Sequence, residues 1–205
     1  MNGKLKVILA SGSKNRKNIL KALGVDFTAV PSKIDERNVS GKSIEEKIKN
    51  IARRKAQHAA KAKHSLIIAA DTFSTIGKTE LHKPANRSEA RTLLKKISGK
   101  KIRVRTGICI INTERNYEIC ELRSATIYCK NLSDKQIEEY VKKKPVTEWA
   151  AAYNPEDPIS SKIFVPVKPY RYGMENFSLP LDILSRELKK AGIEVDVSRR
   201  LRTKS

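Results

Sequence analysis

Aromatic residues, cysteines and acidic residues are all scarce in this sequence of 205 residues. Aromatic residues make up 5% of the chain, which disfavours a protein that binds nucleic acid by stacking bases. Cys109, Cys120 and Cys129 are odd in number, lack the spacing of metal ligands and fall in strand-like stretches. No stretch is long and apolar enough to span a membrane, and the N-terminus has no signal-peptide pattern. We therefore expect a cytoplasmic protein with reduced core thiols and no membrane partner.

The shortage of acidic residues leaves a large positive charge. Lysine and arginine number 43 against 22 aspartates and glutamates, which gives a net charge of +21. Such a charge attracts nucleotides, phosphorylated ligands or nucleic acid. The basic residues are spread over nearly every segment, and only residues 198–205 form a dense run, which we expect to be a solvated tail. The sequence contains no recognisable nucleic-acid module, so it allows this partner without favouring it. A generally basic proteome or a hot habitat would explain the charge equally well.

A short apolar run at residues 66–70 predicts a strand buried on both faces, as in the middle of an α/β sheet. We expect this strand to end at Asp71. Ligands of α/β folds bind outside the carboxyl ends of central strands, so Asp71 is placed where a site would be. An aspartate after a strand also commonly caps a turn. From this run alone, the turn cap is the simpler interpretation.

The other segments complete a prediction of the α/β class. Apolar periodicity, helix caps and turn residues indicate the elements. The expected helices cover residues 14–23, 43–63, 86–98, 132–141 and 180–191. The expected strands cover residues 4–10, 25–30, 102–112, 117–129 and 162–167, and residues 113–116 join two of these strands as a hairpin.

Two basic residues and two carboxylates are candidates for a site. Arg16 lies at a strand-turn-helix mouth, where free backbone amides favour phosphate, although a surface arginine is the simpler alternative. Lys55 falls inside the apolar stripe of its helix, which costs desolvation unless an anion compensates or the side chain extends to the rim. Asp35 and Glu36 follow a strand and could bind Mg²⁺ beside a phosphate, or could simply be solvated.

The order of several motifs resembles the Maf family, and the likeness covers almost the whole chain. The motifs are Leu9-Ala10-Ser11-Gly12-Ser13-x-x-Arg16, Pro31-Ser32-x-Ile34-Asp35-Glu36, Lys55-Ala56, Ala70-Asp71-Thr72, Lys83-Pro84, Ile97-Ser98-Gly99 and Thr106-Gly107. The resemblance implies an elongated mixed β-sheet with flanking helices that forms two lobes around a central cleft, as in inosine triphosphatases. We expect a single domain of two lobes over residues 1–197, followed by the basic tail. The resemblance also implies a homodimer that hydrolyses nucleoside triphosphates to the monophosphate and pyrophosphate, as a house-cleaning activity.

The resemblance further implies roles for individual residues. Asp71 would be catalytic, by orienting or deprotonating a water or by helping to hold the metal. Glu36 is the better-matched second ligand for Mg²⁺ or another divalent cation such as Mn²⁺. Six residues would bind the substrate: Arg16, Lys55 and Lys83 would neutralise the triphosphate, Ser11 and the amides near Ser13 would hold phosphate oxygens, and Thr72 would face the base.

The sequence departs from the family at several positions, of which Asn15 and Glu156 would read the base. Asn15 stands where the family has an arginine, and Glu156 stands where a base-reading glutamine is expected. Ser178-Leu179-Pro180 replaces Gly-Leu-Pro. Thr72 matches the branch of the family that acts on dTTP and UTP, whereas Asn15 and Glu156 fit that branch poorly. The candidate substrates are therefore dTTP, UTP and modified nucleotides. The alternative is a nucleotide- or nucleic-acid-binding protein with little or no turnover.

Overall fold

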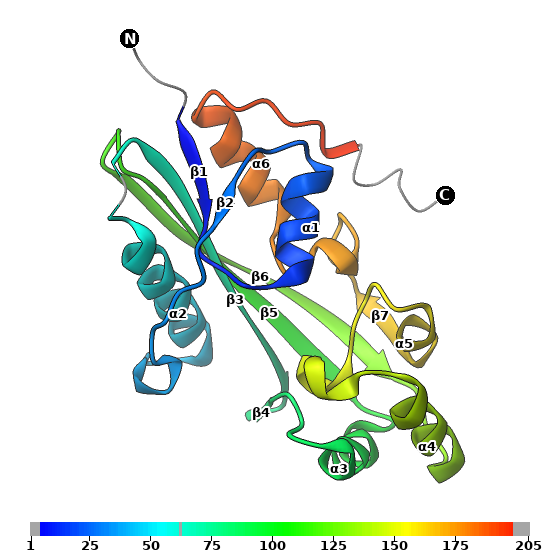
Figure 1. Ribbon diagram of the computed structural model, residues 1–205. Coiled ribbons are helices and arrows are strands. Elements are labelled where there is room, and N and C mark those ends of the chain that lie inside the picture. The colour runs from blue at the N-terminus through cyan, green and yellow to red at the C-terminus, as the bar shows by residue number, and fades with distance from the viewer. Residues whose placement is uncertain (1–4, 62, 199–205) are drawn as a thin grey trace. The chain divides into compact units, whose positions relative to one another are not determined.

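The computed structural model describes residues 5–61 and 63–198 (Figure 1). The helices are α1 (Lys14–Ala22), α2 (Ile44–Ala59), α3 (Arg87–Ile97), α4 (Asp134–Lys143), α5 (Pro158–Ile163) and α6 (Leu181–Lys190). The strands are β1 (Lys6–Leu9), β2 (Thr28–Ala29), β3 (Ser65–Ile76), β4 (Thr79–Leu81), β5 (Lys101–Asn112), β6 (Tyr117–Cys129) and β7 (Phe164–Lys168). No helix in this part of the chain is long and apolar enough to cross a membrane.

The strands of the described residues form one seven-stranded mixed sheet in the order β2-β1-β3-β5-β6-β7, with β4 paired to β3. Strand β1 runs parallel to both β2 and β3, whereas β4 and β7 pair antiparallel to β3 and β6. The predicted α/β fold with a mixed sheet and flanking helices is therefore confirmed. Strand β2 is shorter than predicted, and α5 precedes β7 where the sequence indicated only a strand.

The chain divides into two compact units. Unit 1 comprises residues 1–72, 106–123 and 176–205, and unit 2 comprises residues 73–105 and 124–175. The long strands β3, β5 and β6 contribute residues to both units. The central cleft and the domain bounds stay predictions, and residues 199–205 of the predicted tail lie outside the described residues.

In unit 1, α2 covers one face of the sheet, and α1 and α6 cover the other (Figure 1). The α2 face is filled by a cluster in which Ala52 and Ala56 of α2 pack with Ile8 of β1 and with Ile67 and Ala69 of β3. Because successive side chains of a strand point to opposite faces, the even-numbered residues of β3 point towards α1 and α6. This alternation places Asp71 and Thr72 on opposite faces of the sheet.

Strand β3 corrects the prediction for Asp71. The apolar residues 66–70 are buried as expected, but the strand continues through Asp71 to Ile76. Asp71 therefore lies inside a strand and caps no turn. The strand can continue through polar residues because its later part pairs with β4 and because Asp71 and Thr72 have polar partners.

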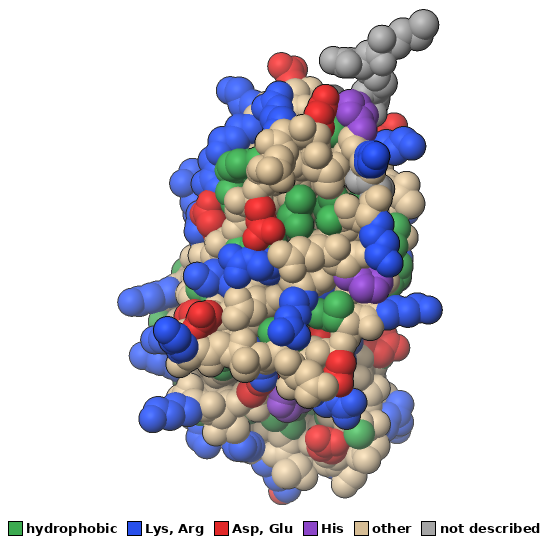
Figure 2. All heavy atoms as spheres, turned by 90° about the vertical axis from the view of Figure 1, so that its left-hand side faces the viewer, with side chains coloured by type: hydrophobic (Ala, Val, Ile, Leu, Met, Phe, Trp, Pro, Cys, Tyr) green, Lys and Arg blue, Asp and Glu red, His purple; other side chains and the backbone are tan. Residues whose placement is uncertain are grey.

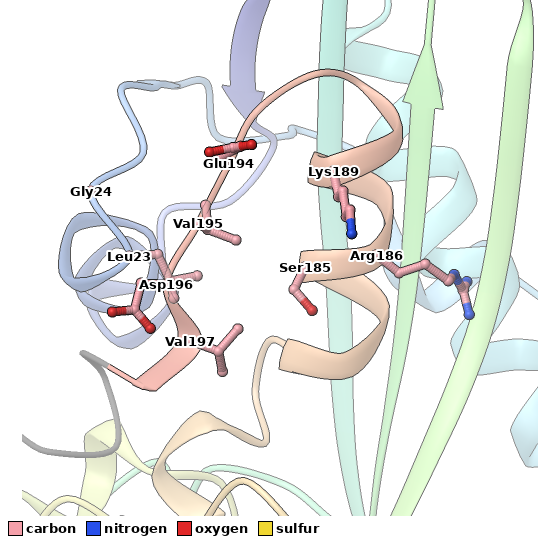
Figure 3. Close-up of a pocket in the computed structure, with 9 residues that line it drawn as sticks. All are labelled: Leu23, Gly24, Ser185, Arg186, Lys189, Glu194, Val195, Asp196 and Val197. Carbon is pink, nitrogen blue, oxygen red and sulfur yellow. The ribbon is translucent and has the colours of Figure 1, made fainter.

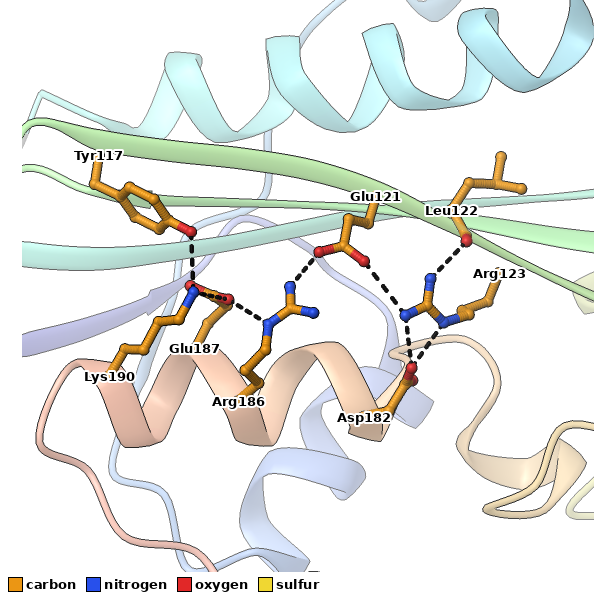
Figure 4. Close-up of polar contacts among 8 residues, drawn as sticks. All are labelled: Tyr117, Glu121, Leu122, Arg123, Asp182, Arg186, Glu187 and Lys190. Carbon is orange, nitrogen blue, oxygen red and sulfur yellow. Dashed lines mark hydrogen bonds and ion pairs between the residues drawn. The ribbon is translucent and has the colours of Figure 1, made fainter.

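Helix α6 is attached to β6 by a charged network (Figure 4). Arg123 lies 2.7 Å from Asp182, and Arg186 pairs with both Glu121 and Glu187. Glu187 is 2% exposed. Burial alone would raise the pKa of Glu187, but hydrogen bonds from Arg186 and Lys190 bring it below its usual value. The network fixes α6, and with it the segment that leads into the helix.

The cysteines differ from the prediction. Cys109 of β5 and Cys120 of β6 form a disulfide, so the expectation of reduced thiols is wrong for this pair. Their Cα atoms lie 4.2 Å apart, the spacing of directly opposed residues in an antiparallel pair. Cys129 is free and buried, as expected, and burial raises the pKa of its thiol to about 12.

Candidate active site

A buried cation bridges two carboxylates in unit 1. The Lys55 Nζ atom lies 2.7 Å from Asp71 Oδ1 and 2.8 Å from Glu36 Oε1. Lys55 and Asp71 are 8% and 7% exposed, whereas the Glu36 side chain is 49% exposed. The interior position of Lys55 in the α2 stripe is thus compensated by anions, and its side chain does not extend to the rim. We call these three residues the acidic triad.

The structure distinguishes Glu36 from its neighbour. Asp35 caps the short 3₁₀ turn Glu36–Asn38, where its side chain accepts hydrogen bonds from the Arg37 amide and from Asn38. Glu36 instead turns its carboxylate to Lys55. Of the two candidates for a metal ligand, Glu36 is therefore the one beside Asp71.

The second carboxylate oxygen of Asp71 lacks the partner that the first oxygen has in Lys55. Asp71 Oδ2 is buried and has no hydrogen-bond partner among the described residues. A buried polar atom in this condition costs about 1–3 kcal/mol, so a native structure normally pairs it with water or a ligand. Two adjacent carboxylates with a spare oxygen fit a hard divalent cation, which takes oxygen ligands from protein and phosphate.

Arg16 forms a second cluster on the opposite face of the sheet. Its Nη1 donates to Ser11 Oγ at 3.0 Å, its Nη2 to Thr72 Oγ1 at 3.3 Å, and its Nε to the Ser178 carbonyl at 2.9 Å. Thr72 Oγ1 is also 2.9 Å from Thr106 Oγ1. We call these five residues the arginine cluster. Arg16 is 8% exposed, so the interpretation as a surface arginine is wrong.

The electrostatics connect the two clusters. Burial lowers the pKa of the Arg16 guanidinium, while the charges of Asp71 and Glu36 act in the opposite direction. Asp71 and Thr72 are consecutive residues of β3, so their side chains point to opposite faces of the strand. Unit 1 therefore holds a carboxylate–lysine group on the α2 face and a guanidinium–hydroxyl group on the α1 and α6 face.

The structure places the other predicted residues as follows. Ser13 caps α1 by accepting a hydrogen bond from the Arg16 amide, and Asn15 follows in the first turn of that helix. Lys83 and Glu156 belong to unit 2, where Lys83 is an exposed residue of the segment after β4. Glu156 lies in a turn in which its amide donates to Asn154 Oδ1 at 3.0 Å. The predicted roles of these four residues stay predictions.

Comparison with known proteins decides the family. The family model described as "Maf: Maf-like protein" matches residues 6–169. The chain belongs to the Maf family. Its relatives include proteins named dTTP/UTP pyrophosphatase. One from Caldicellulosiruptor bescii is 39% identical, with 72% of this chain and 77% of that protein covered. One from Caldicellulosiruptor saccharolyticus is 36% identical over 93% of this chain and 96% of that protein. One from Bacillus anthracis is 32% identical over 93% and 97%.

A solved structure supports the fold of this Maf chain. A HAM1 protein from Coxiella burnetii aligns with a TM-score of 0.50 and 18% identity. The alignment covers 91% of this chain and 99% of that protein. At this identity the likeness concerns the fold alone.

Sequence reasoning did not assign Thr106 and Ser178 of the Maf chain to the site. Thr106 could have been found, because it opens the Thr106-Gly107 motif on a predicted strand. Gly107 has a packing role: a Cβ atom there would lie 2.9 Å from Ile48 Cγ2, so glycine allows α2 to approach β5 closely. Ser178 gave no comparable signal beyond its replacement of a family glycine.

A separate pocket of about 690 Å³ lies elsewhere in unit 1, between α6 and the segment that follows it (Figure 3). Figure 3 shows Val195 and Val197 facing α6, while Arg186 points away from them. No residue of the acidic triad or the arginine cluster lines this pocket. It is lined by Leu23, Gly24, Ser185, Arg186, Lys189, Glu194, Val195, Asp196 and Val197.

Proposed function

We propose that this Maf chain hydrolyses a nucleoside triphosphate to the monophosphate and pyrophosphate, with dTTP and UTP as the first candidate substrates. The observation that carries the proposal is the acidic triad, in which a buried lysine holds two carboxylates and Asp71 keeps an unpaired buried oxygen. The names of the relatives, dTTP/UTP pyrophosphatase, support the choice of substrate.

The reaction needs an activated water and compensation of phosphate charge. The water oxygen forms a bond to the α-phosphorus while the bond from that phosphorus to the bridging oxygen breaks, and pyrophosphate leaves with the electron pair. Asp71 would orient the water through Oδ2 and accept its proton. A bound Mg²⁺ would offset phosphate charge, and Glu36 and Asp71 would supply oxygen ligands for it.

The cations of the site would bind the triphosphate. Lys55 fixes both carboxylates and adds a positive charge beside them. A guanidinium has five N–H donors, and Arg16 uses three of its own in bonds to other described residues. Two donors therefore remain for phosphate oxygens. Fixed donors of this kind stabilise the charge of the transition state without reorganisation.

The proposal is tested by incubating the protein with a panel of nucleoside triphosphates and Mg²⁺ and measuring pyrophosphate. Asp71→Asn keeps the size of the side chain, and we expect it to lower kcat at least about 100-fold, as for loss of a general base. Asp134→Asn is a matched control, because Asp134 is exposed at the start of α4. Unchanged turnover in Asp71→Asn would show that another carboxylate carries the reaction.

The second candidate is nucleotide or nucleic-acid binding without turnover, which the net charge of +21 favours. On the face that Figure 2 draws, the basic side chains are scattered among acidic and apolar ones, which argues against a dedicated nucleic-acid surface on that face. Absence of pyrophosphate from every triphosphate, together with tight nucleic-acid binding at moderate salt, would favour this candidate. The proposal also includes a homodimer acting in the cytoplasm, which rests on the family resemblance. Light scattering tests the oligomeric state.

A further inference from the structure

We propose that the Ser178 hydroxyl is an additional substrate-binding group, which hydrogen-bonds a polar atom of the nucleoside beside Arg16. The inference rests on the proposed function and deepens it by adding a specificity-determining residue. The substrate atom that Ser178 would contact is a hydrogen-bond donor or acceptor of the base or of the ribose.

The position of Ser178 is fixed with respect to Arg16. Its carbonyl accepts the hydrogen bond from Arg16 Nε at 2.9 Å. The next residue, Leu179, is fully buried and donates its amide to the Asn176 carbonyl at 3.1 Å. Pro180 then leads into α6, which the charged network ties to β6. Ser178 is therefore held on both sides, and its side chain starts from a defined place in the arginine cluster.

The side chain of Ser178 forms no hydrogen bond within the described residues. Its Oγ is buried and has no hydrogen-bond partner in that part of the chain. A buried hydroxyl in this condition lowers stability, and its removal would normally be neutral or favourable. The carbonyl that holds Arg16 would be present whatever the side chain. The hydroxyl at this position is thus unexplained by folding alone.

The location of Ser178 indicates which part of the substrate it would contact. Arg16 joins Ser178 to Thr72, on the sheet face opposite to Asp71 and Lys55. The reacting phosphate belongs beside Asp71, and Arg16 would donate to phosphate oxygens. Ser178 and Thr72 flank Arg16 on the other face, so their side chains are left for the nucleoside. A serine hydroxyl turns among three staggered rotamers, so it can reach a group bound beside Arg16 without movement of the backbone.

The test is Ser178→Ala, with Ser185→Ala of α6 as a matched control outside both clusters. We expect Ser178→Ala to raise KM about tenfold, the effect of one lost hydrogen bond, with kcat within about twofold of wild type. Its affinity for a non-hydrolysable α,β-imido triphosphate, measured by calorimetry, should fall by a similar factor. Its melting temperature should equal or exceed that of wild type.

The substrate panel identifies the partner atom. A loss for UTP that is absent for dUTP assigns the contact to the ribose 2′-hydroxyl. An equal loss for both leaves the base and the 3′-hydroxyl, which 2′,3′-dideoxyuridine triphosphate distinguishes. Wild-type KM and analogue affinity in Ser178→Ala, with a raised melting temperature, would overturn the inference while leaving the proposed function intact. A wild-type protein that binds the analogue but releases no pyrophosphate would overturn the proposed function, and calorimetry on the variant would still decide the role of Ser178. Absence of analogue binding by the wild type would overturn both.

Discussion

Replacement of Lys55 by methionine tests the electrostatics of the acidic triad. Methionine keeps much of the length of lysine and removes the charge. Because the side chains of Lys55 and Asp71 are only 11% and 10% exposed, the change leaves a buried carboxylate without its cation. Loss of one partner of a buried pair typically costs about 3–5 kcal/mol. The Glu36 side chain is half exposed, so water screens its pairing with Lys55, which should contribute less than about 1 kcal/mol.

This difference between the two carboxylates can be measured with double-mutant cycles. The free energy of unfolding is obtained from urea titrations followed by circular dichroism. Combining Lys55→Met with Asp71→Asn removes both charges, and we expect a coupling energy of about 1–3 kcal/mol. Combining Lys55→Met with Glu36→Gln should give less than about 1 kcal/mol. Additive effects for the Asp71 cycle, or a larger coupling for Glu36, would refute the assignment of Asp71 as the buried partner.

Three further predictions concern the packing, the disulfide and the metal. Gly107→Ala should lower the free energy of unfolding by about 1–3 kcal/mol, because the new Cβ would be too close to Ile48 of α2. Gly12→Ala is the control: its Cβ would lie at an ordinary contact distance of 3.7 Å from Pro31, so the free energy of unfolding should change little. Thiol titration of the denatured, unreduced protein should detect Cys129 alone. Reduction of the disulfide should lower the free energy of unfolding by about 2–3 kcal/mol, and equal stability before and after reduction would count against the disulfide. Glu36→Gln should raise the Mg²⁺ concentration needed for pyrophosphate release, whereas Asp35→Asn should not; the reverse order would exchange their roles.

Hydropathy predicted the central strand but not its end. The apolar residues 66–70 carry a clear signal, whereas Asp71 and the residues after it look like a turn. The structure continues β3 to Ile76 because Lys55 neutralises Asp71 and Thr106 pairs with Thr72. Both partners are distant in sequence. A hydropathy pattern along one segment contains no information about such partners, so the boundary could not be predicted from it.

The disulfide could have been predicted from the hairpin. The loop at residues 113–116 was expected from the sequence, and it places Asn112 opposite Tyr117. Counting three residues back along each strand brings Cys109 opposite Cys120, the pair that the structure joins. The expectation of reduced thiols came from the odd number of cysteines and the inferred compartment. Register is the stronger argument, because opposed residues of an antiparallel pair lie close enough for a disulfide.

The residues of the candidate site differ in how well the sequence predicted them, because some of their partners lie far away along the chain. Lys55 stood out because a charge inside an apolar stripe needs an anion, and the structure supplies two. Arg16 was ambiguous, because its place at a strand-turn-helix mouth also fits a surface arginine. Its burial depends on Ser178, which is 162 residues away in sequence. Ser178 replaces a family glycine, but it carried no other signal, since a serine before Leu179-Pro180 looks like an ordinary loop residue.

The consecutive pair Asp71-Thr72 explains how one strand can serve two tasks. Alternation of side chains gives Asp71 to the α2 face, with Lys55 and Glu36, and Thr72 to the other face, with Arg16 and Thr106. A shift of β3 by one residue would exchange the two faces. Depending on its direction, it would place Asp71 among the hydroxyls or Thr72 beside the buried lysine. The register of β3 is set by its parallel pairing with β1, in which Leu66 lies beside Val7 and Ile68 beside Leu9. The apolar half of β3 thus fixes the register that its polar half needs for the chemistry.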